Sequence, residues 1–234
     1  MTERSPSELE HKINYHFHNV QLFHQALAHS SFANEHRAEG QNDNERREVL
    51  GDAGLELGSS DILYHQYPDL QEGKLTKLRA SLVCEPTLAS CAKEIDLSDY
   101  LMLGKGEEQT GGRTRNSIVS DALEALIGAI YLDGGLEPAR SFIERFIMTD
   151  IEHKKLFYDS KTVLQEIVQR DYRQDNVRYV IVGEDGPDHA KVFRVEVEIG
   201  GIVAGTGSGS TKKAAEQEAA FQAIQKLGAG GEKK

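Results

Sequence analysis

The fold of the first half of the chain is decided by the stretch Asn44-Glu45-Arg46-Arg47-Glu48-Val49-Leu50-Gly51-Asp52. Its acids Glu45, Glu48 and Asp52 are three and four residues apart, so a helix places the three carboxylates along one stripe. The helical pattern continues to Pro68, which cannot extend it. An acidic stripe is more often a solvated helix face than a metal site, so the spacing alone leaves both interpretations open.

A second acidic pair, Asp121 and Glu124, has helical spacing within residues 118–132, which are otherwise almost wholly apolar. Charged groups on so apolar a helix are costly to desolvate without a partner. Two acid-bearing helices that face each other would offer several carboxylate oxygens to a hard cation such as Mg²⁺. In phosphodiester cleavage, such an ion can activate a water molecule and stabilise the leaving oxygen.

The first part of the chain, about 150 residues, carries one helical pattern after another, which predicts an all-α domain. Ser117 is expected to cap one of these helices. Gly51, Gly54 and Gly58 would let neighbouring helices approach closely, at a cost of about 1 kcal/mol each relative to alanine. The expected helices cover residues 20–28, 45–67, 75–83, 87–94, 118–132 and 137–151, with loops at 33–44 and 104–116.

The pattern changes after Asp159. A short helix over residues 161–170 precedes three segments of alternating polarity, which predict strands at residues 178–182, 192–199 and 201–207. Gly200-Gly201 supplies a hairpin turn between the last two strands. An amphipathic helix follows over residues 211–227. The order α-β-β-β-α predicts a small α+β domain.

The formal net charge of −11 argues at first against a nucleic-acid partner. Residues 1–159 carry −11 and residues 160–227 carry −1, and divalent cations can neutralise acidic surface. No stretch approaches about 18 consecutive apolar residues, so we expect no membrane span. Residues 1–10 lack the apolar core of a secretory signal, and Cys84 and Cys91 are expected to stay reduced. These features favour a cytoplasmic protein.

The stretch of residues 44–52 closely resembles the nine-residue signature of the ribonuclease III family. The resemblance implies a magnesium-dependent endonuclease that cuts double-stranded RNA, processes ribosomal precursors and structured transcripts, and leaves 5′-phosphate and 3′-hydroxyl ends with short 3′ overhangs. It also implies a catalytic domain at residues 1–152, a linker at 153–159, a double-stranded-RNA-binding domain at 160–228 and a disordered tail at 229–234. Other stretches that resemble the family are residues 26–31, 34–35, 72–80, 103–107 and 120–129.

The family's site residues carry over to matching positions in this sequence. Asp52 and Glu124 match the positions most essential for catalysis. Glu45 matches an acid near the cleft and the subunit contact, and Glu72 matches an acid that assists at the RNA cleft. The resemblance also implies a homodimer whose two sites line one valley. The metal-binding carboxylates of the family match Glu48, Asp52, Asp121 and Glu124.

Some positions depart from the family's pattern. Arg47 stands where the family commonly has an apolar residue, and Val49 stands where it usually has phenylalanine. That aromatic ring packs across the dimer interface, and loss of a buried ring costs on the order of 3 kcal/mol in a well-packed site. Gly54 and Gly58 replace bulkier residues. The resemblance therefore predicts activity but leaves the strength of the dimer open.

Residues 207–217 resemble the closing motif of double-stranded-RNA-binding domains. Lys212 and Lys213 at a helix N-terminus suit a phosphate, although the family usually has a third basic residue where Ser210 stands. His189, in the loop 186–189, matches a residue that reaches a minor groove. A lysine pair is more often a solvated surface, so the assignment depends on the match of the whole module. The helix face expected at another minor groove carries Thr162, Gln165 and Glu166.

Two other functions compete with the nuclease. A non-catalytic protein that binds RNA duplexes without cutting them is the main alternative, and the intact Asp52 and Glu124 favour the enzyme. An unrelated helical metallophosphohydrolase would need a metal-binding histidine arrangement that the sequence lacks. His29 is expected to be structural, and contact of Arg113 and Arg115 with RNA phosphates is the less favoured interpretation of these residues.

Overall fold

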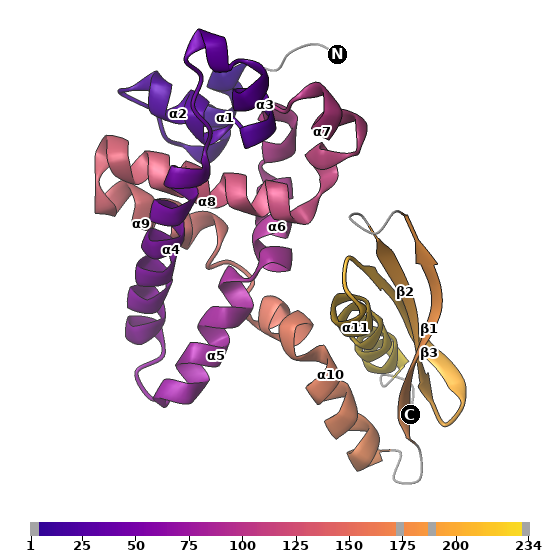
Figure 1. Cartoon of the computed structure of the whole chain (residues 1–234). Coiled ribbons are helices and arrows are strands. Elements are labelled where there is room, and N and C mark those ends of the chain that lie inside the picture. Colours follow the sequence, from indigo (N-terminus) through magenta and orange to yellow (C-terminus); the bar gives the residue numbers. More distant parts are fainter. Residues whose placement is uncertain (1–4, 172–175, 187–190, 231–234) are drawn as a thin grey trace. The chain divides into compact units, whose positions relative to one another are not determined.

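The computed structural model describes residues 5–171, 176–186 and 191–230, with side chains up to Leu227. The chain divides into two compact units, and the division falls between Ile151 and Glu152. The first unit is helical, and the second combines a three-stranded antiparallel sheet with helices (Figure 1). The predicted succession of an all-α part and a small α+β part is confirmed.

The first unit is built around α8 (Asn116–Gly134), against which α2, α4, α6 and α9 all pack. Eleven residues of α8 are buried. Among them Ile118, Val119, Ala122, Leu123, Leu126, Ile127 and Ile130 belong to the main hydrophobic cluster of this unit. The other helices are α1 (Pro6–Ile13), α2 (Val20–Ala26), α3 (Ser30–Glu35), α4 (Glu45–Gln66), α5 (Glu72–Val83), α6 (Glu85–Glu94), α7 (Lys105–Gln109) and α9 (Leu136–Phe146), with 3₁₀ turns at Arg37–Glu39, Leu97–Tyr100 and Gly112–Thr114.

Helices α4 and α8 cross with their backbones in contact. A Cβ atom on Gly51 would lie 1.7 Å from the carbonyl oxygen of Glu124, and one on Gly128 would lie 2.3 Å from the carbonyl oxygen of Arg47. Only glycine therefore fits at this crossing. The predicted role of Gly51 in close helix packing is confirmed, and the site residues of both helices lie within one turn of the crossing.

The other two glycines of α4 differ from each other. A Cβ atom on Gly58 would lie 2.8 Å from Cδ1 of Ile143 in α9, so the expected close approach is confirmed there. A Cβ atom on Gly54 would meet Ile127 only at 3.9 Å, which is ordinary van der Waals contact. The expectation that Gly54 serves close packing is therefore wrong.

Near the C-terminal end of α8, Asp133 binds the N-terminal segment formed by residues 15–19. The side chain of Asp133 is 2 % exposed. Its carboxylate accepts hydrogen bonds from the backbone N–H groups of His18 (2.9 Å) and Asn19 (2.8 Å) and from the Tyr15 hydroxyl (2.8 Å). Burial alone raises the pKa of Asp133, but these donors outweigh it and hold the pKa at about 2.

Several predicted boundaries are corrected by the structure. Helix α8 begins at Asn116 after Arg115, so Ser117 is not its cap. The loops expected at 33–44 and 104–116 contain the end of α3, α7 and 3₁₀ turns, which are too short to show a period in the sequence. The helix expected at 137–151 is interrupted after α9, where Asp150 takes a left-handed conformation (φ 49°).

The second unit comprises α10 (Ile151–Asp171), β1 (Val177–Asp185), β2 (Val192–Ile199), β3 (Ile202–Gly209) and α11 (Lys212–Gly230), with strand order β1-β2-β3. Helix α10 begins ten residues before the predicted start at residue 161 and includes residues 153–159, the predicted linker. Gly200 and Gly201 both have positive φ between β2 and β3, so the predicted hairpin turn is confirmed. Of the predicted tail, residues 229 and 230 belong to α11 and residues 231–234 lie outside the described residues.

Helix α11 packs closely on β3 because glycines alternate along that strand. Cβ atoms on Gly205 and Gly207 would lie 2.3 Å from backbone atoms of Ala219. A Cβ atom on Gly209 would lie 2.8 Å from Cβ of Ala214. This contact of glycines with alanines closes a separate hydrophobic core, which includes Leu164, Val168, Val195, Val197, Ala215, Ala219 and Ala223.

Two expectations from composition concern the chain as a whole. Within the described ranges, none of the helices combines the length and the apolar character needed to cross a bilayer. Cys84 and Cys91 are both free thiols, as expected.

Candidate metal centre and nucleic-acid interface

Three of the predicted metal-binding acids converge where α4 and α8 cross. Glu48 lies one turn before Gly51 on α4, while Asp121 and Glu124 lie on α8. Each of these three acids offers one carboxylate oxygen, and the three oxygens all lie within 4.8 Å of one another. All three residues are partly buried. The backbone contact between the helices therefore produces a compact acidic cluster, defined here as Glu48, Asp121 and Glu124.

The acidic cluster is electrostatically unfavourable without a cation. Burial, followed by the charges of Asp52, Asp121 and Glu48, raises the pKa of Glu124 to about 8. Burial and the charge of Asp121 also raise the pKa of Glu48. The pKa of Asp121 is raised by burial and by the charge of Glu85. Such a cluster favours bound protons or a bound cation over three free carboxylates.

Asp52, the fourth predicted ligand, is exposed on α4 and lies outside the group of three oxygens. Its charge nevertheless raises the pKa values of both Glu124 and Glu48, so it belongs to the same electrostatic environment. The structure thus brings three of the four predicted ligands together and places the fourth at their solvent-exposed side.

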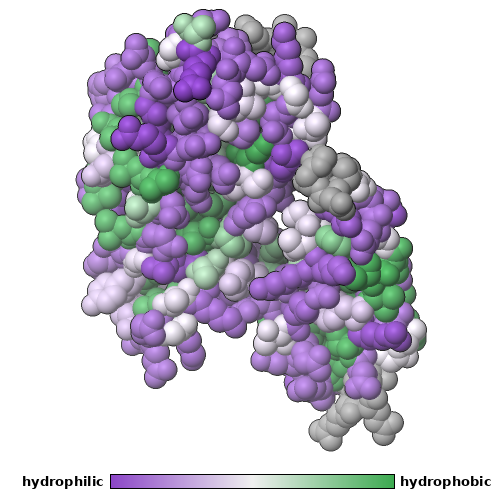
Figure 2. All heavy atoms as spheres, viewed as in Figure 1, coloured by the Kyte–Doolittle hydropathy of each residue, from purple (hydrophilic) through white to green (hydrophobic). Residues whose placement is uncertain are grey.

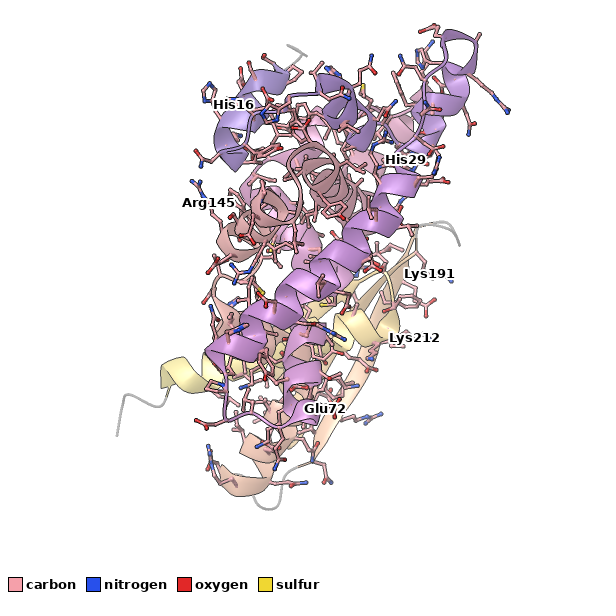
Figure 3. All side chains as sticks on the ribbon, turned by 90° about the vertical axis from the view of Figure 1, so that its left-hand side faces the viewer. His16, His29, Glu72, Arg145, Lys191 and Lys212 are labelled. Atoms are coloured by element: carbon pink, nitrogen blue, oxygen red, sulfur yellow. The ribbon has the colours of Figure 1, made fainter. Side chains whose placement is uncertain are left out.

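The two predicted secondary acids lie outside the cluster. Glu45 is exposed at the start of α4, and its charge contributes to the raised pKa of Glu48. Glu72 begins α5, and its Oε1 accepts a hydrogen bond from the Thr76 hydroxyl at 3.1 Å. In Figure 3, His29 lies near the start of α4, whereas Glu72 lies near the opposite end of that helix. Glu72 instead lines a surface cavity of about 410 Å³ between α4 and α5.

Two further acids act on the cluster and were not predicted. Glu56 raises the pKa of Glu124 and forms an ion pair with Arg79 at 2.7 Å. It lies four residues after Asp52, so extending the acidic stripe by one turn would have found it. Glu85 begins α6, and no spacing rule connects it with α8. Only the packing of α6 on α8 reveals its effect on Asp121.

His29 is structural, as predicted. Its Nδ1 accepts a hydrogen bond from the backbone N–H of Ser31 at 3.2 Å and thereby caps α3. Electrostatic interaction with His29 is also one of the influences that lower the pKa of Asp121, so the ring lies near the cluster. Arg113 and Arg115 are held in ion pairs of 2.6 Å with acids of α7, Glu108 and Glu107 respectively.

The departures in the signature helix have distinct environments. Arg47 is partly buried, and its guanidinium donates to the side chain of Gln25 and, at 3.4 Å, to the carbonyl oxygen of Asp43. Burial lowers its pKa. Val49 is 71 % exposed, and with Leu57 and Tyr64 it forms an exposed apolar stripe on α4. Figure 2 shows hydrophobic surface on the α4 and α9 side of this unit.

The residues expected to contact RNA are exposed in the second unit. Thr162, Gln165 and Glu166 lie on α10, and Lys212 and Lys213 lie in the first turn of α11. The Thr211 hydroxyl accepts a hydrogen bond from the backbone N–H of Ala214 at 3.1 Å and caps α11. His189 lies outside the described residues.

Comparisons with known proteins agree with this arrangement of the two units. A family model described as ribonuclease-III-like matches residues 19–151, and one described as a double-stranded RNA binding motif matches residues 160–227. The chain belongs to the ribonuclease III family. It is therefore an endoribonuclease that acts on double-stranded RNA, and the alternative of a non-catalytic binding protein is set aside.

Ribonuclease 3 proteins from other bacteria are similar to this chain along almost its whole length. Ribonuclease 3 of Listeria monocytogenes serovar 1/2a is 51 % identical over 94 % of this chain and 96 % of the relative. Ribonuclease 3 of Bacillus velezensis is 46 % identical over 94 % of this chain and 89 % of the relative. The solved nuclease domain of ribonuclease III from Campylobacter jejuni has a TM-score of 0.58 and 40 % identity, and the match covers 62 % of this chain and 98 % of that domain. Family members depend on a metal, and the acidic cluster is consistent with that dependence.

Proposed function

We propose that this chain cleaves double-stranded RNA with Mg²⁺ held by Glu48, Asp52, Asp121 and Glu124. The observation that carries the proposal is the convergence of three carboxylates within 4.8 Å at the α4–α8 crossing. By analogy with the family, the products carry 5′-phosphate and 3′-hydroxyl ends with short 3′ overhangs. The natural substrates we propose are ribosomal RNA precursors and structured transcripts. We propose that the enzyme acts on them in the cytoplasm.

The donor set fits a hard divalent cation. All the proposed ligands are carboxylates, and Mg²⁺ prefers oxygen ligands and retains several of its waters. A cation at this position would relieve the repulsion that raises the pKa values of Glu48 and Glu124. When bound, Mg²⁺ supplies activation of the attacking water and stabilisation of the leaving oxygen.

The chain's own residues set the conditions for that binding. Glu124, with a pKa of about 8, holds a proton at neutral pH in the absence of metal. Metal binding must displace this proton, so affinity for Mg²⁺ rises with pH. Asp52 is exposed beside the cluster, where solvent and substrate reach it. We assign the catalytic roles to Asp52 and Glu124.

The second unit supplies the grip on the duplex. Lys212 and Lys213 place cationic groups and free backbone N–H groups at one end of α11, which suits an RNA phosphate. Thr162, Gln165 and Glu166 form an exposed polar face on α10 suited to the 2′-hydroxyls of a minor groove. We also assign His189 to a minor groove, and we keep the domain limits of 1–152 and 160–228.

The exposed apolar stripe of α4 is the surface we propose for homodimer formation. Leu57 is 58 % exposed and Tyr64 is 69 % exposed, a cost that a second copy of the chain would remove. Tyr64 also borders the 410 Å³ cavity, together with Leu63, Leu70 and others. The related Campylobacter jejuni nuclease domain has a region involved in dimer formation, which supports this choice of partner.

The experiment that tests the site is cleavage of a labelled RNA duplex with Mg²⁺ or with chelator. We expect cuts that require Mg²⁺ in the wild type, and a loss of about 10³-fold or more in Glu124→Gln, with duplex binding in chelator retained. Glu94→Gln, an exposed acid at the end of α6, removes the same charge and should cut normally. Undiminished cutting by Glu124→Gln would refute the assigned site.

A further inference from the structure

A β-bulge in β1 turns one acid of the second unit toward α11. Ile181 and Gly183 pair with consecutive residues of β2, so the residue between them is extra. Beyond the bulge, Glu184 pairs with Phe193, and residues directly opposite each other in an antiparallel pair share a face. Phe193 packs against the core beneath α11. If every residue from Ile181 onward paired in regular alternation, Glu184 would lie opposite Val192 and point to the other face of the sheet.

On this face, Glu184 lies between two lysines. Its Oε1 is 4.0 Å from Nζ of Lys212, and its Oε2 is 3.4 Å from Nζ of Lys191. The Lys212 ammonium also lies 5.6 Å from the centre of the Phe193 ring. Figure 3 labels Lys191 and Lys212 at the same edge of this unit. The side chain of Glu184 is 41 % exposed and that of Lys212 is 58 % exposed, so solutes reach both.

The next residue along β1 forms a separate ion pair on the other face. Asp185 lies 2.9 Å from Nη2 of Arg194, whose guanidinium crosses Gly183 to reach it. A Cβ atom on Gly183 would lie 2.8 Å from that guanidinium. Two neighbouring acids of one strand therefore neutralise different cations on opposite faces of the sheet.

Lys212 and Lys213 consequently differ although they are adjacent. Lys212 shares its charge with Glu184. Across the described part of the chain, Lys213 forms no ion pair with an acid. Since both are proposed phosphate contacts, one of the two cations is already partly neutralised before RNA arrives.

We propose that Glu184 competes with RNA phosphates for Lys191 and Lys212 and thereby limits the affinity of this domain for duplexes. The proposal rests on the proposed role of Lys212 as a phosphate contact. A phosphate that approaches Lys212 must displace the carboxylate or lie beside it, and two anions at one cation repel each other. Retaining Glu184 near the phosphate also reduces the net number of cations released from the RNA on binding.

The test compares Glu184→Gln with Asp185→Asn, which remove the same charge from adjacent positions on opposite faces. Binding of a fluorescent RNA duplex is measured by anisotropy in chelator, where no cutting occurs, over a series of salt concentrations. We expect Glu184→Gln to bind about three- to ten-fold more tightly at low salt, and Asp185→Asn to stay within about two-fold of the wild type. The salt slope of Glu184→Gln should steepen by up to about 1.

The effect should disappear when the two lysines are absent. In a Lys191→Ala/Lys212→Ala background, we expect Glu184→Gln to change affinity by less than about two-fold. Equal gains from Glu184→Gln and Asp185→Asn would mean that net charge alone acts, and would overturn the proposal while leaving the role of Lys212 intact. If Lys212→Ala changes neither affinity nor salt slope, the phosphate contact itself is wrong and the competition proposal fails with it.

Discussion

Glu124 and Asp133, two of the partly buried acids of helix α8, differ greatly in proton affinity. Near its middle, Glu124 faces other carboxylates, and burial and their charges raise its pKa to about 8. At its end, the side chain of Asp133 is only 2 % exposed, yet hydrogen-bond donors from the N-terminal segment hold its pKa at about 2. Burial alone therefore does not determine the charge of an acid. Asp133 has hydrogen-bond donors within the chain and serves the fold. Glu124 is surrounded by other carboxylates, which favour a bound proton or a bound cation.

The largest effect is expected from breaking the geometry that gathers the acids. Gly51→Ala places a Cβ 1.7 Å from the carbonyl oxygen of Glu124 and forces α4 and α8 apart. We expect a loss of about 3 kcal/mol or more in the free energy of unfolding and a loss of cleavage. Thermal unfolding and the duplex-cutting assay measure both.

The matched control is Gly54→Ala, which lies on the same helix and meets Ile127 only at 3.9 Å. It should be neutral or stabilise the protein by up to about 1 kcal/mol through helix propensity, and cleavage should persist. Equal damage from the two substitutions would show that α4 tolerates no alanine and that the crossing has no special role.

Neutralising Glu124 and neutralising Asp133 should change stability in opposite directions. Because the folded pKa of Glu124 lies above its ordinary value, the folded protein binds the extra proton, and stability falls as pH rises from about 4.5 to about 8. In chelator at pH 8, Glu124→Gln should therefore raise Tm by about 3 °C or more, and this gain should shrink at pH 5. A Tm series against pH checks the prediction.

For Asp133 the sign is reversed. Its lowered pKa contributes stability above pH 4 that is lost as pH falls toward 2. Asp133→Asn should therefore lower the free energy of unfolding by about 2 kcal/mol at neutral pH, because the amide is a poorer acceptor for three donors. Addition of Mg²⁺ should stabilise Asp133→Asn as much as the wild type but should stabilise Glu124→Gln much less. The same sign for both variants would contradict the comparison.

On the exposed side of α4, the apolar side chains of Val49, Leu57 and Tyr64 are open to solvent. Val49→Phe should lower the dissociation constant of the proposed dimer about ten-fold, because a phenyl ring buries more apolar area in the interface than the side chain of valine. Leu57→Lys should weaken it instead. Sedimentation equilibrium measures the dissociation constant, and a mass independent of either substitution would place the interface elsewhere.

The smallest effect is expected for duplex binding, at the neighbouring residues Lys212 and Lys213 of the second unit. Lys213→Ala should weaken duplex binding about ten-fold at low salt and lower the salt slope by about 1, whereas Lys212→Ala should cost less because Glu184 already neutralises part of its charge. Anisotropy titrations of the two variants at matched salt decide between them. A larger loss for Lys212→Ala would reverse the order that the structure predicts.

Much of the fold and part of the site could be predicted from the sequence because their signals are local. The acids of α4 and α8 follow helical spacing. Gly51 has low helix propensity, but only glycine fits where α4 crosses α8. The hairpin at Gly200-Gly201 follows from turn chemistry. Resemblance to the family then assigned the acids, which spacing alone left ambiguous.

What the sequence could not predict depends on contacts between distant residues. Glu85 reaches Asp121 only because α6 packs on α8. The donors to Asp133 come from residues more than 110 positions earlier in the chain. The bulge in β1 is a single extra residue, which leaves no mark on the polarity pattern but decides which face Glu184 occupies.

Anomalous diffraction from crystals soaked in Mn²⁺ tests directly whether the α4–α8 crossing creates a metal site. Mn²⁺ accepts the same oxygen ligands as Mg²⁺. We predict an anomalous peak in contact with Glu48, Asp121 and Glu124, and no such peak in Glu124→Gln crystals. If the enzyme cuts duplex RNA with Mn²⁺ but the ion binds elsewhere, in contact with none of these carboxylates, the α4–α8 crossing is not the metal site.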